Sequence, residues 1–172
     1  MAWLRRKSSD PELPQAIRDT LVLERGERVL ASAPAEDGTW VLVTTTRLYA
    51  AAPAGEPLAR PWHLVDGGKW DHDAFTLTVT WVDGAKPQQW VFRESMQVLA
   101  AFRERVQASV VLTEQVPLGT GRSARVVIRK NLADGSMHDQ TLLGKGVRLA
   151  DPGVAQAVAD ARARLREQVG LI

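Results

Sequence analysis

Residues 75–106 read FTLTVTWVDGAKPQQWVFRESMQVLAAFRERV, and this stretch decides the fold class. Apolar side chains alternate with threonine over residues 75–82, a period of two that predicts a half-buried strand. An Asp-Gly dipeptide then predicts a tight turn, and residues 88–93 supply the partner strand. Beyond that point the apolar residues recur at helical spacing, so we expect a helix over residues 95–108.

Short strands separated by turn-forming residues also precede this stretch. Four of them are expected within residues 28–65, where Pro, Gly and Asp-Gly signals divide the chain. A short helix from about Pro11 to Leu21, with Asp10 as its N-cap, is expected before them. Downstream, residues 109–172 carry three more strand patterns and then a helical stripe formed by Val154, Val158, Ala161, Leu165 and Val169. The predicted order is helix, six strands, helix, three strands and helix.

Two short motifs make residues 24–108 resemble a bacterial pleckstrin-homology-like (PH-like) or GRAM-like domain. The first is VTTTRLY at residues 43–49. The second is RPWHLV at residues 60–65, the expected fourth strand, followed by FTLTV at residues 75–79. The resemblance implies an antiparallel barrel or sandwich of about six to seven strands that a helix caps. That helix would plug one end with Met96, Leu99, Phe102 and Val106.

The sequence therefore predicts an α+β, mainly β protein in three parts. Residues 1–23 form a basic tail and a short helix, and residues 24–108 form the PH-like domain. Residues 109–172 form a β-hairpin and helix extension that packs on this domain or makes a small second unit. The Asp37-Gly38 hairpin lacks the basic cluster that would hold a phosphoinositide, so the resemblance implies a fold and not a ligand.

Composition excludes several classes of protein. The chain has 172 residues, of which 45% are hydrophobic and 24% charged, values typical of a globular domain. It has no cysteine, which excludes disulfides, thiolate nucleophiles and cysteine zinc sites. The net charge of +2 is too small to indicate nucleic acid by itself. The sequence shows neither a secretory signal nor an apolar run of about 18 residues, so we expect the protein in the cytoplasm or peripherally at the membrane. The resemblance implies a bacterial origin.

No constellation of residues predicts catalysis, a cofactor or a metal. His63 and the Asp71-His72-Asp73 triplet carry metal-ligand side chains, but their spacing matches no ligand pattern, and the triplet suits a turn. Residues 119–123, GTGRS, precede an expected strand, whereas phosphate-binding loops of this kind open a helix. We therefore predict a protein that is not an enzyme and needs no cofactor.

Two groups of residues are candidate binding surfaces. The first suits the interface of an anionic membrane and consists of Trp3, Leu4, Arg5, Arg6 and Lys7. The second would face an anionic partner and consists of Arg122, Arg125, Arg129 and Lys130. Arg125 and Arg129 share one strand face with Val127, so they should project together. A solvated tail and a solvated strand face are the alternatives.

These observations predict a protein-binding or adaptor module. Strand edges and rims of such folds accept a protein or peptide partner by shape and by β-augmentation. A peripheral membrane protein that binds anionic lipid through Trp3–Lys7 is the alternative. Nucleic acid is disfavoured because residues 103–172 contain no Phe, Trp or Tyr on which bases would stack. The oligomeric state stays open.

Overall fold

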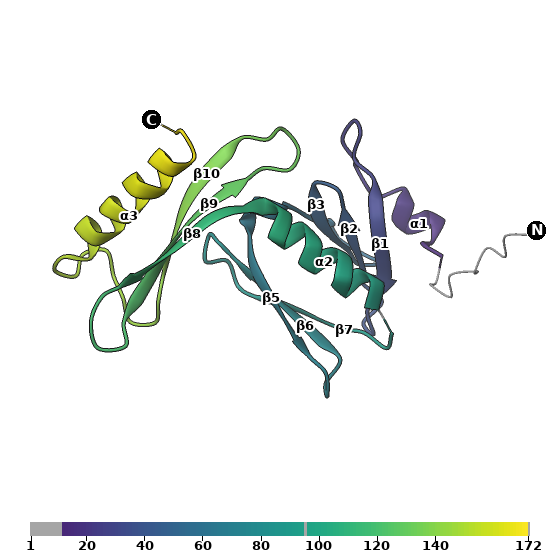
Figure 1. The fold of residues 1–172 in the computed structure, drawn as a ribbon. Helices are drawn as coiled ribbons and strands as arrows, with labels where there is room; N and C mark the ends of the chain where they lie inside the picture. The colour runs from purple at the N-terminus through teal and green to yellow at the C-terminus, as the bar shows by residue number, and fades with distance from the viewer. Residues whose placement is uncertain (1–11, 95, 172) are drawn as a thin grey trace, which may run out of the picture.

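The computed structural model describes residues 12–94 and 96–171 (Figure 1). In this part of the chain, ten strands form three antiparallel sheets, accompanied by three α-helices and one 3₁₀ turn. The protein is therefore α+β and mainly β, as predicted. Strands that follow one another in sequence lie side by side in every sheet, because short turns join each strand to the next.

The first sheet consists of β1 (Val29–Pro34), β2 (Trp40–Thr44), β3 (Arg47–Ala51) and β4 (Leu58–Pro61), paired in that order. Every residue of β2 is buried, since the strand carries apolar side chains on both faces. Val41 and Val43 enter the main core. Trp40 and Leu42 point the other way and pack in a second cluster with Ile17.

Ile17 belongs to helix α1 (Gln15–Arg18), which is much shorter than the helix predicted from Pro11 to Leu21. Pro14 has φ −59° and ψ 145°, an extended conformation, so the helix begins only after it. Ile17 is the buried residue of α1 and holds it on the outer face of the first sheet.

The sequence predicts a fourth strand over residues 60–65, whereas the structure ends β4 at Pro61. A 3₁₀ turn, η1 (Trp62–Leu64), follows and carries the chain from the first sheet to the second. The Trp62 side chain turns inward and is 0% exposed. Its Nε1–H donates to the carbonyl oxygen of Thr44 at 3.0 Å. The strand is interrupted because this indole is buried between the two sheets.

The second sheet consists of β5 (Val65–Asp71), β6 (Thr76–Trp81) and β7 (Gln88–Val91). The predicted alternation in β6 is confirmed, since Leu77, Val79 and Trp81 are buried. Phe75 was expected on the same face, but it lies in the turn before β6 with φ 48° and is 52% exposed. Its ring meets Trp70 edge-on, with 6.4 Å between the centroids.

Helix α2 (Met96–Ser109) lies across both sheets and covers the main core (Figure 1). Phe102 is buried, and Leu99 and Val106 are partly buried against the same cluster, in agreement with the predicted stripe. Val98 of α2, which the predicted stripe did not include, is also in this core and is 1% exposed. The side chain of Met96, also in that stripe, lies outside the described part.

Gly68 makes room for α2 on the second sheet. A Cβ at this position would overlap the Phe102 ring and press on Leu77. We expect Gly68→Ala to lower the free energy of unfolding by about 1–3 kcal/mol in urea denaturation, because the buried ring must leave its rotamer. Gly67→Ala is the matched control and should be close to neutral, because a Cβ there meets no atom within 4 Å. Equal losses in the two variants would contradict this packing.

The third sheet consists of β8 (Val110–Pro117), β9 (Ser123–Lys130) and β10 (Met137–Leu143), with β9 in the centre. Helix α3 (Val154–Gln168) packs on one face of it. Its predicted stripe is confirmed, because Val154, Val158, Ala161 and Leu165 are buried. Ala124, Val126 and Ile128 of β9 pack in the same cluster. The alternate residues of β9 therefore point to the opposite face, toward the first two sheets.

None of the three sheets in the described part closes into a barrel, which corrects the barrel implied by the resemblance. The η1 turn separates β4 from β5, so these strands do not extend one sheet into the next. The residues that directly follow β1 and β7 form a single β-bridge, between Ala35 and Phe92. The first two sheets share one core between them instead.

Candidate functional site

Arginines on both flanks of α3 fasten it to the third sheet. On one flank, Arg164 pairs with Glu114 of β8, and this contact raises the pKa of Arg164. On the other flank, Arg162 and Arg166 both pair with Asp139 of β10. The helix can present these residues together because positions four apart lie on one side.

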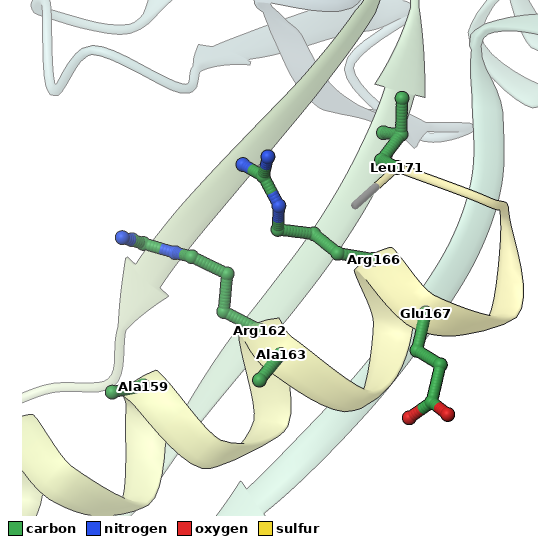
Figure 2. A pocket seen from close by; sticks show the side chains of 6 residues that line it. All are labelled: Ala159, Arg162, Ala163, Arg166, Glu167 and Leu171. Atoms are coloured by element: carbon green, nitrogen blue, oxygen red, sulfur yellow. The ribbon is translucent and has the colours of Figure 1, made fainter.

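A groove of about 670 Å³ runs along the Arg162–Arg166 flank. We call it the α3 groove, and its lining residues are Ala159, Arg162, Ala163, Arg166, Glu167 and Leu171. Figure 2 shows the two guanidinium groups extending from α3 on one side, while the carboxylate of Glu167 points away from them. Small and apolar side chains make up the rest of the lining, so an apolar floor lies beside two cations.

The two arginines of the α3 groove share one counter-ion. Arg162 Nε lies 2.8 Å from Asp139 Oδ2, and Arg166 Nη1 lies 3.3 Å from Asp139 Oδ1. Arg162 also donates from Nη2 to Thr141 Oγ1 at 2.9 Å. One carboxylate thus faces two guanidinium groups whose side chains are 43% and 42% exposed. The two accessible guanidinium groups therefore carry one positive charge more than the carboxylate that they contact, while the Glu167 carboxylate, also in the lining, points away from them (Figure 2).

The groove adjoins an open sheet edge. β10 pairs with β9 along its whole length, from Met137 opposite Lys130 to Leu143 opposite Ala124. No strand of the described residues pairs with the other edge of β10. Asp139 and Thr141 are therefore on a strand that offers backbone donors and acceptors next to the two arginines.

The structure does not assemble the four cations predicted to face an anionic partner. Arg125 and Arg129 do share a face, but it is the covered one, and both pair with Asp66 of β5. Arg129 is 2% exposed, and it donates to Ser109 Oγ and to the backbone oxygen of Asp66, at 3.0 Å each. Burial lowers the pKa of Arg129, which the Asp66 carboxylate opposes. Arg129 is consequently a structural cation.

The other two members of that predicted group lie apart. Arg122 is in the β8–β9 turn and pairs with Asp151, whose pKa is lowered chiefly by the backbone N–H of Arg148. Lys130 ends β9 and is exposed. The GTGRS segment is this tight turn, closed by a 2.9 Å bond from the N–H of Arg122 to the oxygen of Gly119.

The predicted membrane-binding group, Trp3, Leu4, Arg5, Arg6 and Lys7, lies outside the described residues. Among the helices that the structure does describe, none has the length and apolar character needed to cross a bilayer.

Two other polar clusters have structural explanations. The Glu27 carboxylate is buried, accepts from the Glu24 N–H at 2.9 Å and lies 3.3 Å from the Tyr49 hydroxyl. Burial, and then Glu27, raise the pKa of Tyr49. The Asp71-His72-Asp73 triplet forms the expected turn, in which Asp71 Oδ1 accepts two backbone N–H groups that lower its pKa. Among the described residues, no group of three or more His, Asp or Glu is placed to hold a metal ion.

Sequence reasoning missed the α3 groove. Its cations are on α3 and their counter-ion is on β10, and no local motif connects these two segments. The available signal was weak: Arg162 and Arg166 lie off the apolar stripe of the helix. Only the pairing of β10 with β9 brings Asp139 beneath them.

Comparison with known proteins gives no assignment. A scan against protein-family models, a search of curated proteins and a search of solved structures found no match to this chain.

Proposed function

We propose that this protein is a non-enzymatic binding module of the bacterial cytoplasm that takes up an extended, carboxylate-bearing peptide along the open edge of β10. The observation that carries the proposal is the position of the α3 groove, in which two arginines share the single carboxylate of Asp139, beside an unpaired strand edge. In this mode, backbone hydrogen bonds to the strand supply affinity and pockets for alternate side chains supply specificity.

The peptide would lie between β10 and α3. Its backbone would pair with the outer edge of β10, and its apolar side chains would cover Ala159, Ala163 and Leu171. A carboxylate on the peptide would engage Arg166, which makes one long contact with Asp139. Arg162 would stay in place, because its Nη2 donates to Thr141 Oγ1 at 2.9 Å and its Nε lies 2.8 Å from Asp139 Oδ2. An acidic peptide is favoured because one guanidinium lacks a counter-charge of its own.

The PH-like assignment of residues 24–108 is part of the proposal. It is supported by the order of elements: a four-stranded meander, a three-stranded meander and then a helix across the core that they share. The third sheet with α3 would then be an addition that carries the binding edge. The ligand would be set by this addition and not by the PH-like part.

A selection experiment tests the proposal. The full chain is immobilised and panned against a phage library of linear random peptides, and the selected sequences are synthesised with each acidic residue intact or changed to its amide. We expect selected peptides to carry Asp or Glu and the amide forms to bind more weakly. Failure to select any peptide, or equal binding of acid and amide forms, would contradict the proposal.

Arg166→Gln should weaken binding of the selected acidic peptide by about tenfold to a hundredfold, because a hydrogen bond to a charged group contributes about 1.5–3 kcal/mol. Fluorescence anisotropy of the labelled peptide measures this. Arg164→Gln is the matched control: it removes a cation of the same helix from the opposite flank and should leave the affinity unchanged. Equal effects of the two substitutions would show that the helix charge acts without a defined site.

A further inference from the structure

The face of the third sheet opposite α3 lies against η1 and β5, and we call this contact the joint. On the side of the third sheet, the joint is formed by Arg125, Val127 and Arg129 of β9 and by His138, Gln140 and Leu142 of β10, which share this face by their register. Gln140 Nε2 donates to the backbone oxygen of His63 in η1 at 2.7 Å. Helix α2 passes directly into β8 at Ser109–Val110, so the chain connects the two sides of the joint there without an intervening loop.

Two histidines stack face to face across the joint. The rings of His63 and His138 are 4.4 Å apart between centroids, and their planes differ by 5°. His63 is only 9% exposed, and its Nδ1 is buried without a hydrogen-bond partner. Close parallel stacking with an unpartnered ring nitrogen suits neutral imidazoles, because a second positive charge on the facing ring would be repelled.

The charged groups around the two histidines have opposite effects on the pKa of His63. Arg129 of β9 adds positive charge to the joint, and Asp134 of the β9–β10 turn adds negative charge. Burial, then His138 and Arg129, lower the pKa of His63, while Asp134 acts in the opposite direction more weakly than burial and His138. Asp134 accepts from the Ser136 hydroxyl and N–H, which lowers its own pKa, so it stays ionised in mildly acidic solution.

We infer that the joint is sensitive to pH: acidification protonates the buried His63 ring, which stacks on His138, and releases the β9–β10 hairpin from η1. The ordinary pKa of histidine is 6.5, and in the folded chain the pKa of His63 is lower. Above pH 6.5 both the folded and the unfolded chain carry His63 uncharged, so the closed joint keeps its full stability. As the pH falls below that value the unfolded or opened form takes up the proton first. The closed joint therefore loses stability on the acidic side, and its closure is favoured near neutrality.

The absence of cysteine allows a direct test by distance measurement. Glu56→Cys in the β3–β4 loop and Ala155→Cys on α3 place one exposed spin label on each side of the joint. Electron–electron double resonance is recorded at about pH 8 and about pH 5, which bracket the titration of histidine. We expect a narrow distance distribution at the higher pH and a broader one, shifted to longer distance, at the lower pH.

His63→Gln removes the buried ring that takes up the proton and should keep the narrow distribution at both pH values. His72→Gln is the matched control: it removes the remaining histidine, which is exposed in the β5–β6 turn, and should respond to pH as the wild type does. His138→Gln keeps His63 but removes the second cause of its lowered pKa, and it should broaden less than the wild type at the lower pH; it serves as a second test if His63→Gln does not give the wild-type distribution at the higher pH. A wild-type distribution that does not change with pH, or a His63→Gln variant that broadens like the wild type, would overturn the inference. The distance measurement involves no peptide, so a negative result here is distinguishable from failure of the proposed peptide-binding function.

Discussion

Asp66→Asn is expected to lower the free energy of unfolding by about 3–5 kcal/mol, because it removes the counter-ion of a buried arginine. Arg129 is 2% exposed, and its guanidinium keeps only neutral partners, Ser109 Oγ and a backbone oxygen, once the Asp66 carboxylate is gone. Arg125 loses its partner in the same substitution. Urea denaturation followed by far-UV circular dichroism measures the loss through the transition midpoint.

Two further variants show whether the buried charge is the cause. Asp66→Asn combined with Arg129→Met removes the uncompensated cation, so the double variant should be more stable than the sum of the two single losses predicts. Asp83→Asn is the matched control, since Asp83 pairs with Arg60 while its side chain is 46% exposed. It should cost much less, because exposed ion pairs contribute little. If the losses of unfolding free energy from Asp66→Asn and Arg129→Met simply add in the double variant, the explanation is contradicted.

Trp62→Ala is expected to cost about 3–5 kcal/mol of unfolding free energy as well, here through a cavity in the core. The indole is 0% exposed and meets the Phe102 ring edge-on, with 5.7 Å between centroids. Its Nε1–H bond to the backbone oxygen of Thr44 is also lost. The residue is in the turn that joins two sheets, so little backbone is free to collapse into the space.

The measurement is again the urea midpoint, followed by far-UV circular dichroism because the variant loses a fluorophore. Trp70→Ala is the matched control: it removes the same side chain from a partly buried position against the same core. It should cost clearly less than Trp62→Ala, and Trp62→Phe should fall between them. If both alanine variants lose the same stability, Trp62 is not the central contact between the two sheets.

Periodicity gave the correct secondary structure in two elements that bury one face. The alternation in β6 and the helical stripe of α3 were both read correctly, because the burial of one face selects the side-chain spacing. Phe75 shows the limit of this reasoning. It continues the alternation in the sequence, but it precedes β6 in a turn where φ is positive, and its ring lies at the surface.

The arginines show a second limit. Alternation correctly placed Arg125 and Arg129 on one face of β9, but it does not tell what covers that face. In the structure, Asp66 of a distant strand covers it and converts an apparent surface cation into a buried one. The same applies to Arg162 and Arg166, which look like solvent-facing helix residues until β10 brings Asp139 beneath them.

The mainly β class, the order of most elements and the core faces of β6 and α3 were predictable from the amino-acid sequence, because these features follow from spacing along the chain. Three features were not predictable in this way: the sheets stay separate, His63 stacks on His138, and the α3 groove lies beside an open edge. These features depend on pairs of residues that are far apart in sequence. Each side chain of such a pair carries no local sign of its partner, so only the packing of whole sheets defines them.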